Sequence, residues 1–242
     1  MAGRGIGRAL LGSGLLAVTV LGGAGGYGIG LMTSAASENA GGAVPLGWVT
    51  PATDPSSTPS VPVAPRKTPK PDHTEPMQAD ELSYRTREFD TEKNVRSHIT
   101  VKVPRNWWMT QPDPKLLGRF TDPTGKRWLR VESGFTRTRP PADSMALRME
   151  QLRDLPPSQT LTFLSHDVDP VTKAATLAYT YIPPIPPDSE TLRYVIVRWV
   201  VLDSSGFVGV EMSSTGLPQD KAALLDVLDH ATKSVTRSDS PL

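Results

Sequence analysis

The chain contains no cysteine among its 242 residues. This absence excludes disulfide bonds, thiolate metal sites, a cysteine nucleophile and a lipid anchor on an N-terminal cysteine. An excess of either charge is also missing, since 26 Lys and Arg stand against 25 Asp and Glu and the formal net charge is +1. A broad basic surface that would draw the protein to nucleic acid is therefore not expected.

Charged residues are missing altogether between Arg8 and Glu38. Within this stretch residues 9–32 are mostly apolar and match the roughly 20 residues that cross a bilayer as a helix. The sequence predicts one transmembrane helix, a signal-anchor, at 9–32 after a short cytoplasmic N-terminus at 1–8. Because Arg4 and Arg8 precede the helix, the positive-inside tendency keeps the N-terminus cytoplasmic and places the rest of the chain outside.

A cleavable signal peptide is the alternative, because the small residues Ser34, Ala35 and Ala36 suit a cleavage site. The apolar run is longer than a typical signal core of roughly 7–15 residues, which favours a retained anchor. The expected location is the cell membrane, with one span and an extracytoplasmic C-terminal domain. Cleavage would release the same domain as a secreted protein.

Gly22, Gly26 and Gly30 recur at every fourth position of the predicted helix. They share one helical face, which would let a second helix approach closely and form a homodimer in the bilayer. The alternative is that they reflect composition alone, since small residues four apart are common in apolar segments. In both cases residues 9–32 have the lipid bilayer as their partner.

Residues 33–80 are rich in Pro, Ser and Thr and nearly free of large apolar side chains. Such a segment cannot bury enough apolar surface to fold, so the sequence predicts a disordered linker. Its prolines stiffen it, which suits a spacer between the membrane and a domain in the cell envelope.

One globular domain is expected at 84–237, with a flexible tail at 238–242, because short apolar runs alternate there with turn signals. The predicted strands are 98–104, the two runs that flank Asp122–Gly125, 160–168, 174–182, 191–203 and 207–214. The predicted helices are 143–155, capped by Asp143 or Ser144, and 218–235. The run 191–203 is apolar on both faces, as is typical of a central strand. The expected fold class is α+β, a mostly antiparallel sheet flanked by helices.

The stretches VKVPRNWW, GRFTDPTG and LRVESG occur in this order before the first predicted helix, and two hairpins and a final helix follow. This order resembles the PsbP-like α/β/α sandwich, which actinobacterial secreted proteins and lipoproteins carry after a membrane signal and a Pro/Thr-rich tether. The resemblance covers residues 84–237 and implies the sandwich fold, with no catalytic residues to carry over. This chain lacks the cysteine of the lipoprotein members, so its anchor would be the helix at 9–32.

Clustered metal ligands and catalytic motifs are missing from the domain as well. The histidines are separated along the chain and predict no metal site; they are His73, His98, His166 and His230. The group His166, Asp167 and Asp169 precedes Pro170, where a solvated hairpin turn is favoured over a cation site. There is no Gly-x-Ser-x-Gly elbow and no phosphate-binding or dinucleotide-binding glycine motif. The protein is expected to be no enzyme and to need no cofactor.

Four charged residues fall in the middle of predicted strands. Arg130 and Glu132 share one face of their strand, and Arg198 and Glu211 lie in two others. They would form either a polar patch that binds a ligand, or cross-strand ion pairs without further function, and the ion pairs are favoured.

Two adjacent tryptophans, Trp107 and Trp108, follow Pro104 at the end of a predicted strand. One ring is expected to seal the edge of the sheet and the other to face a partner or a polymer. The sequence leaves open which ring does which.

The function expected from these features is that of a membrane-tethered, extracytoplasmic, non-catalytic binding or scaffolding module of the cell envelope. One alternative is a small-ligand sensor or enzyme that uses the charged face of the sheet. Another is a structural homo-oligomer assembled through the glycine face of the anchor.

Overall fold

The computed structural model describes residues 65–112, 115–184 and 190–242. The predicted anchor at 9–32, its three glycines and most of the predicted linker lie outside the described residues. Within the described ranges, no helix is both long enough and apolar enough to cross a membrane.

A seven-stranded sheet forms the centre of the domain, and every neighbouring pair in it is antiparallel. In spatial order its strands are β3 (Trp108–Thr110), β4 (Leu117–Thr121), β5 (Trp128–Glu132), β9 (Val208–Gly216), β8 (Arg193–Val201), β7 (Ala175–Tyr181) and β6 (Thr162–Val168). Strand β8 lies between β9 and β7 and is buried along nearly its whole length, which confirms the central strand predicted at 191–203.

A second, three-stranded sheet contains β1 (Tyr84–Glu92), β2 (Arg96–Pro104) and β10 (Thr236–Ser240). Its central strand is β2, in which the predicted alternation is confirmed because Ile99, Val101 and Val103 are fully buried. Strand β1 is therefore one edge of the small sheet, as β3 is one edge of the large sheet.

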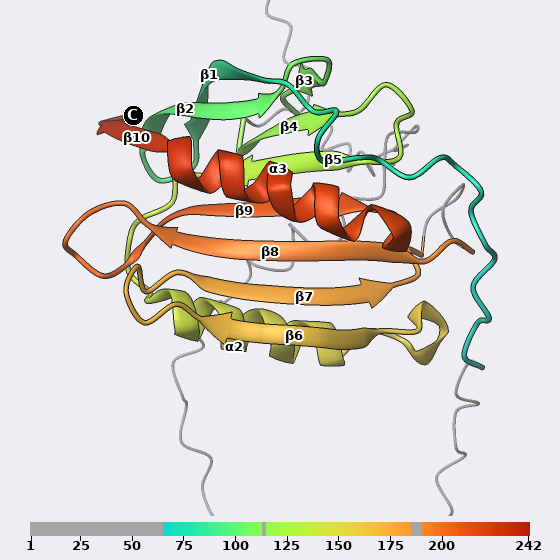
Figure 1. Ribbon diagram of the computed structural model, residues 1–242. Helices are drawn as coiled ribbons and strands as arrows, with labels where there is room; N and C mark the ends of the chain where they lie inside the picture. The colour runs from blue at the N-terminus through green and yellow to red at the C-terminus, as the bar shows by residue number, and fades with distance from the viewer. Residues whose placement is uncertain (1–64, 113–114, 185–189) are drawn as a thin grey trace, which may run out of the picture.

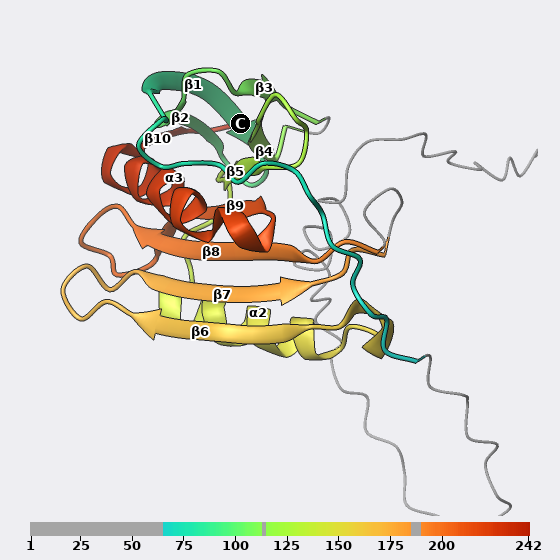
Figure 2. The ribbon, with the colours of Figure 1, turned by 45° about the vertical axis from the view of Figure 1, so that its right-hand side comes forward.

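Two helices cover opposite faces of the large sheet (Figures 1 and 2). Helix α3 (Lys221–Ser234) packs against β8, β9 and β2, and the main core fills the space between this helix and both sheets. Helix α2 (Pro141–Arg153) packs on the other face, where Met145 and Leu152 form a second core with β7 and β8. The class is therefore α+β, a mostly antiparallel fold with two flanking helices, as the sequence predicts. Short 3₁₀ turns, η2 (Pro157–Gln159) and η3 (Pro218–Asp220), complete the elements.

The start of α2 differs from the prediction, which began the helix at Asp143 and capped it with Asp143 or Ser144. The helix begins at Pro141, after Pro140 in an extended conformation, and neither residue caps the N-terminus with its side chain. Proline suits the first helical position because its φ is already helical and its missing N–H has no intrahelical partner there. The Ser144 hydroxyl instead donates to the carbonyl of Pro140 at 3.1 Å.

The turn predicted at Asp122–Gly125 is confirmed, and so is a turn at 204–206 between the runs predicted as strands at 191–203 and 207–214. In the β4–β5 hairpin Gly125 adopts φ of 72°, and the Asp122 carboxylate accepts hydrogen bonds from the backbone N–H groups of Lys126 and Arg127. In the β8–β9 hairpin Gly206 adopts φ of 76°. A positive φ costs glycine little because it has no Cβ.

The C-terminal end corrects the expectation that the domain stops at residue 237. Residues 236–240 form β10, which pairs with β2. This strand is polar, and Arg237 holds it in place by donating to the carbonyls of Gly209 at 2.6 Å and Phe135 at 2.8 Å. An apolar periodicity could not reveal such a strand, because its stability comes from backbone pairing and one buried guanidinium.

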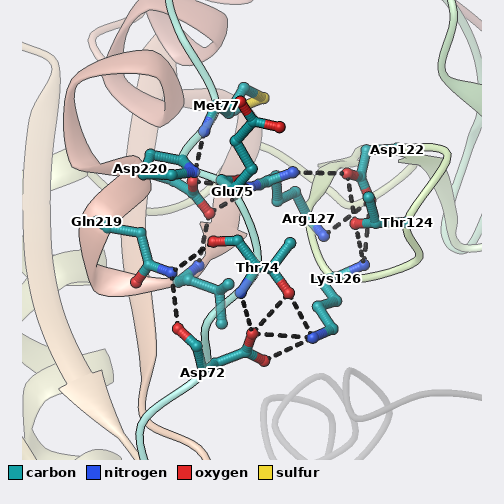
Figure 3. A network of polar contacts seen from close by, with 12 residues as sticks. Asp72, Thr74, Glu75, Met77, Asp122, Thr124, Lys126, Arg127, Gln219 and Asp220 are labelled. Atoms are coloured by element: carbon teal, nitrogen blue, oxygen red, sulfur yellow. Dashed lines mark hydrogen bonds and ion pairs between the residues drawn. The ribbon is translucent and has the colours of Figure 1, made fainter.

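The boundary of the linker is also different from the prediction. Residues 67–77, here called the strap, lie along the surface of the domain although the sequence assigns them to the linker. The carbonyl of Lys67 accepts from Thr160 at 2.9 Å, and the N–H of Lys70 donates to Glu190 at 2.7 Å. Further on, Gln219 donates to the carbonyls of Asp72 and Thr74 (Figure 3). Hydrogen bonds of this kind, one between backbone groups and the others from side chains to the backbone, order a segment that has almost no apolar surface to bury.

Two acidic residues fasten the strap. Lys126 Nζ donates to both carboxylate oxygens of Asp72, at 2.9 and 2.7 Å (Figure 3). Burial opposes ionisation of Asp72, but hydrogen bonds from Lys126 and Thr74 outweigh it and hold the pKa of that carboxyl well below its ordinary value. Asp220, which is 0% exposed, accepts from the N–H of Met77 at 2.9 Å and from Arg127 at 2.7 and 3.0 Å.

Candidate functional site

Three of the predicted charged residues meet on the face of the large sheet that α2 covers. Glu132 on β5 and Glu211 on β9 are direct register partners, and Arg130 lies two residues before Glu132 on the same face. Arg130 Nη2 donates to Glu132 Oε2 at 2.8 Å. The prediction of cross-strand ion pairs is therefore corrected for these two residues, because their ion pair forms along one strand.

Arg148 on α2 is the cation that pairs with the second carboxylate, Glu211, and it was not among the residues predicted from the sequence. Its Nη2 donates to Glu211 Oε1 at 2.7 Å, and Trp199 Nε1 donates to Glu211 Oε2 at 2.8 Å. Arg148 is only 4% exposed. The signal was present in the sequence, because Met145, Arg148 and Leu152 fall on one face at helical spacing and only the middle residue is charged.

Burial and like charge both act on Glu132. Its desolvation is the largest influence and the charge of Glu211 the next, and together they raise the pKa of Glu132 above its ordinary value. Arg130, Lys93 and Arg148 act in the opposite direction, and Lys93 Nζ lies 3.8 Å from Glu132 Oε1. Glu132 is thus the carboxyl on this face best suited to hold a proton.

A pocket of about 230 Å³ opens beside this cluster, and Lys93, Glu132, Arg148, Trp199 and Glu211 contribute to its lining. Each carboxylate in it already has a cationic partner within the protein. The cluster therefore resembles an internally compensated ion-pair network more than an empty receptor for a charged ligand.

Arg198 does not belong to the cluster, which corrects the prediction that placed it with the other three. Neighbouring residues of a strand point to opposite faces, so Arg198 points toward α3 while Trp199 points toward α2. Its Nη1 donates to Asp229 at 2.7 Å and to Thr232 at 3.1 Å, both on α3. Arg198 is a strand-to-helix contact.

The structure decides between the two tryptophans. Trp107 is 1% exposed and belongs to the main core, whereas Trp108 is 44% exposed. Trp107 is the last residue of the connection between β2 and β3, where its N–H donates to the carbonyl of Pro104 at 3.1 Å, and Trp108 is the first residue of β3. Trp107 is the ring that seals the edge, and Trp108 is the ring that faces outward.

Trp108 stands beside an open groove of about 550 Å³ between β1 and β3. Figures 1 and 2 show these two edge strands side by side. Three arginines line the groove, Arg85 and Arg87 on β1 and Arg105 in the turn after β2, and Trp107 and Trp108 lie along it. We call this feature the arginine groove. The sequence signal for this groove is the alternation Arg85-Thr86-Arg87 at the start of the domain, which places two arginines on one face of a strand.

The arginines have few partners. Arg85 Nη2 and Arg105 Nη2 donate to the carbonyls of Trp107 and Tyr84, both at 3.4 Å. The Nε atoms of Arg85 and Arg87 are buried and have no hydrogen-bond partner among the described residues. Within those residues, no carboxylate lies in ion-pair distance of the three guanidinium groups.

One acidic residue, Glu88, also borders the groove. As the next residue of β1 it points to the face opposite Arg87, and its Oε2 lies 3.9 Å from His98 Nε2. Partial burial and the nearby charges of Arg87 and Arg105 lower the pKa of Arg85. The groove is thus a concentration of uncompensated positive charge.

In the described ranges, no three His, Asp or Glu side chains are grouped so that they could hold a metal ion. His166 and Asp167 are exposed on β6. Asp169 accepts from the N–H groups of Val171 and Thr172, at 2.7 and 2.9 Å, as expected of a residue that stabilises a hairpin turn.

No protein-family model and no curated protein matches this chain.

Proposed function

We propose that the protein is a membrane-tethered, extracytoplasmic, non-catalytic binding module of the cell envelope and that the arginine groove is its partner-binding surface. Residues 9–32 are the anchor in this proposal, and the Pro-rich segment after them is the spacer. The order of strands and helices makes a PsbP-like sandwich the proposed fold family.

The observation that carries the binding role is the contrast between the two charged regions. The carboxylates under α2 are all compensated by cations of the same domain, whereas the guanidinium groups of the arginine groove meet no carboxylate in the described part of the chain. Trp108 adds an exposed aromatic surface at the same place. An uncompensated charge beside an exposed aromatic ring is typical of a surface that binds a partner.

In-cell crosslinking tests the binding surface. A photo-crosslinking amino acid replaces Trp108 in the full-length chain, and a second variant carries it at Val171, which is 86% exposed in the β6–β7 turn at the far edge of the sheet. Discrete adducts from position 108 that are absent from position 171 are expected. Identical adduct patterns from the two positions would show that the groove is not the binding surface.

The absence of cysteine allows a clean test of the topology. A Val171→Cys variant is expected to react in intact cells with a maleimide that cannot cross the membrane, whereas an Ala2→Cys variant reacts only after lysis. An intact peptide spanning residues 9–32 in the membrane fraction would establish the retained anchor. Full-length, unprocessed protein in the cytosolic fraction would overturn the tethered location.

A small-ligand sensor or enzyme is the second candidate, and the raised pKa of Glu132 next to the 230 Å³ pocket is what favours it. A ligand of this pocket would raise the thermal stability of the wild-type chain and lose that effect in Glu132→Gln. A screen of uncharged and anionic metabolites by thermal shift, in which wild type and Glu132→Gln respond alike, would remove this candidate.

A further inference from the structure

We propose that the arginine groove binds an extended anionic polymer, a chain that bears phosphate or carboxylate groups at successive units. This inference rests on the proposed function, because it names the class of partner that the binding module takes. The proposed ligand is a flexible polymer, and not a flat bilayer surface or a single small anion.

The arginine groove concentrates positive charge. Three guanidinium groups and one carboxylate, that of Glu88, line the groove, and among the described residues no carboxylate forms an ion pair with the three arginines. Like charges so close together repel, which is the reason that Arg87 and Arg105 contribute to lowering the pKa of Arg85. An anionic ligand would reduce this repulsion by pairing with the guanidinium groups that line the groove. The planar guanidinium group matches phosphate and carboxylate equally well, since both accept paired hydrogen bonds.

The positive charges of the groove are spaced along a strand. Arg85 and Arg87 are two residues apart on β1, so they leave the same face of the strand about 7 Å from each other. Arg105 adds a third charge from a different segment, the turn after β2. A polymer with repeating charges can place one group at each of these positions, whereas a single small anion would pair only with the arginines that converge on it.

The shape of the groove also suits a polymer. The groove runs between two sheet edges, and Trp108 offers a partly exposed ring beside it. An aromatic ring next to a charged groove is the arrangement that holds flexible polymers, because the ring contacts the units while the cations contact the charges. A flat membrane surface would not enter a groove whose arginines Arg85 and Arg87 are partly buried on the inner face of β1.

The test measures binding of fluorescently labelled linear polyphosphate to the full-length chain in neutral detergent, by fluorescence anisotropy. Arg87→Glu is expected to weaken binding at least about tenfold, and Trp108→Ala several-fold. Lys221→Glu makes the same change in net charge at an exposed position on α3 and should stay within about twofold of wild type. Affinity should also fall as salt rises, because bound counterions are released from the polymer.

Two further variants test whether a loss of binding comes from a loss of folded structure. Arg87→Lys keeps the charge and should bind within a few-fold of wild type. If Arg87→Glu loses its far-ultraviolet circular dichroism, Arg105→Glu replaces it, because Arg105 is exposed and lies in a turn. Unlabelled polygalacturonate as competitor separates a carboxylate polymer from a phosphate polymer as the preferred class.

Several results would overturn the inference. These are no binding of either polymer, equal loss in Lys221→Glu, or displacement by inorganic phosphate as effective as polyphosphate at the same phosphate concentration. Stronger, Trp108-dependent binding to vesicles of anionic lipid than to polymer would assign the groove to the membrane surface instead. None of these results decides whether the groove binds a partner at all, because the crosslinking at position 108 tests that proposal separately.

Discussion

Glu132 and Glu211 stand directly opposite each other on neighbouring antiparallel strands, and each carboxylate is held by a different arginine. Like charges placed directly across a sheet are destabilising unless cations compensate them or one of them is protonated. Both conditions are met here, because Arg130 and Arg148 supply the cations and burial favours the neutral form of Glu132.

The raised pKa of Glu132 predicts a particular pH dependence of stability. Between its unfolded pKa of 4.5 and its raised folded pKa, the folded protein holds a proton that the unfolded chain has lost, so Glu132 makes the free energy of unfolding fall as the pH rises through that window. Glu132→Gln should show a smaller fall. Glu211, Arg130, Lys93 and Arg148 are the charged groups that face Glu132, and they are unchanged in this variant.

The measurement is urea denaturation of both proteins from pH 4 to pH 8, read as the difference between the two curves. Carboxyls with lowered pKa, such as Asp72, act in the opposite direction below about pH 4 and cancel in that difference. Parallel curves would mean that the pKa of Glu132 is not raised.

The Arg127–Asp220 contact is expected to be the most sensitive ion pair to mutation. Arg127→Met leaves the fully buried Asp220 carboxylate without its cation, which should reduce the free energy of unfolding by about 3–5 kcal/mol. Lys70→Met breaks an exposed pair with Glu190 and should leave the denaturation midpoint unchanged. Urea denaturation of the two variants side by side makes the comparison, and equal effects would contradict the assignment.

The two tryptophans should respond oppositely to replacement. Trp107→Ala opens a cavity in the main core and is expected to cost about 3–5 kcal/mol of stability, whereas Trp108→Ala should change it by less than about 0.5 kcal/mol. Thermal unfolding followed by circular dichroism tests both. A large loss in Trp108→Ala would mean that this ring supports the fold.

Asp72→Asn should release the strap. The neutral side chain loses its charged interaction with Lys126, so the trypsin sites at Arg66 and Lys67 should be cut several-fold faster while the core resists digestion. In wild-type protein the strap should be released in the same way only at strongly acidic pH, where pepsin replaces trypsin as the probe. The pKa of Asp72 is lowered, so its stabilising effect is complete above pH 3.8 and is lost as the pH falls through the folded value. Unchanged cleavage in Asp72→Asn would show that the remaining contacts suffice.

The glycine face of the predicted anchor also remains testable. Gly26→Ile should reduce crosslinked dimers of the full-length chain in membranes, because the larger side chain prevents close approach of two helices. Ala17→Ile, at another position of the same apolar run, is the control. An undiminished dimer yield in Gly26→Ile would favour the compositional interpretation of the glycines.

The sequence predicted those parts of the fold that depend on apolar periodicity and turn residues. The alternation in β2, the central position of β8 and the turns at Gly125 and Gly206 are all confirmed. Strand β10 and the strap escaped prediction because they are polar and are ordered by long-range hydrogen bonds, which leave no periodic signal.

For the charged residues, the sequence could identify faces but not partners. It placed Arg130 and Glu132 on one face correctly, yet it could not tell that Arg198 belongs to the opposite face from Glu211, because this depends on the register of β8 with β9. Arg85 and Arg105 lie 20 positions apart in the chain, and only the pairing of β1 with β2 brings them together.

The strap has a mechanical consequence. It meets the domain beside Thr160, just before β6, whereas the arginine groove lies at β3, the opposite edge of the seven-stranded sheet. A load applied from the N-terminal side would first break the contacts of Lys67 with Thr160 and of Lys70 with Glu190, and then the Lys126–Asp72 contact. Peeling the strap away would lengthen the chain's reach and transfer the load to the residues just before β1, the strand that lines the arginine groove.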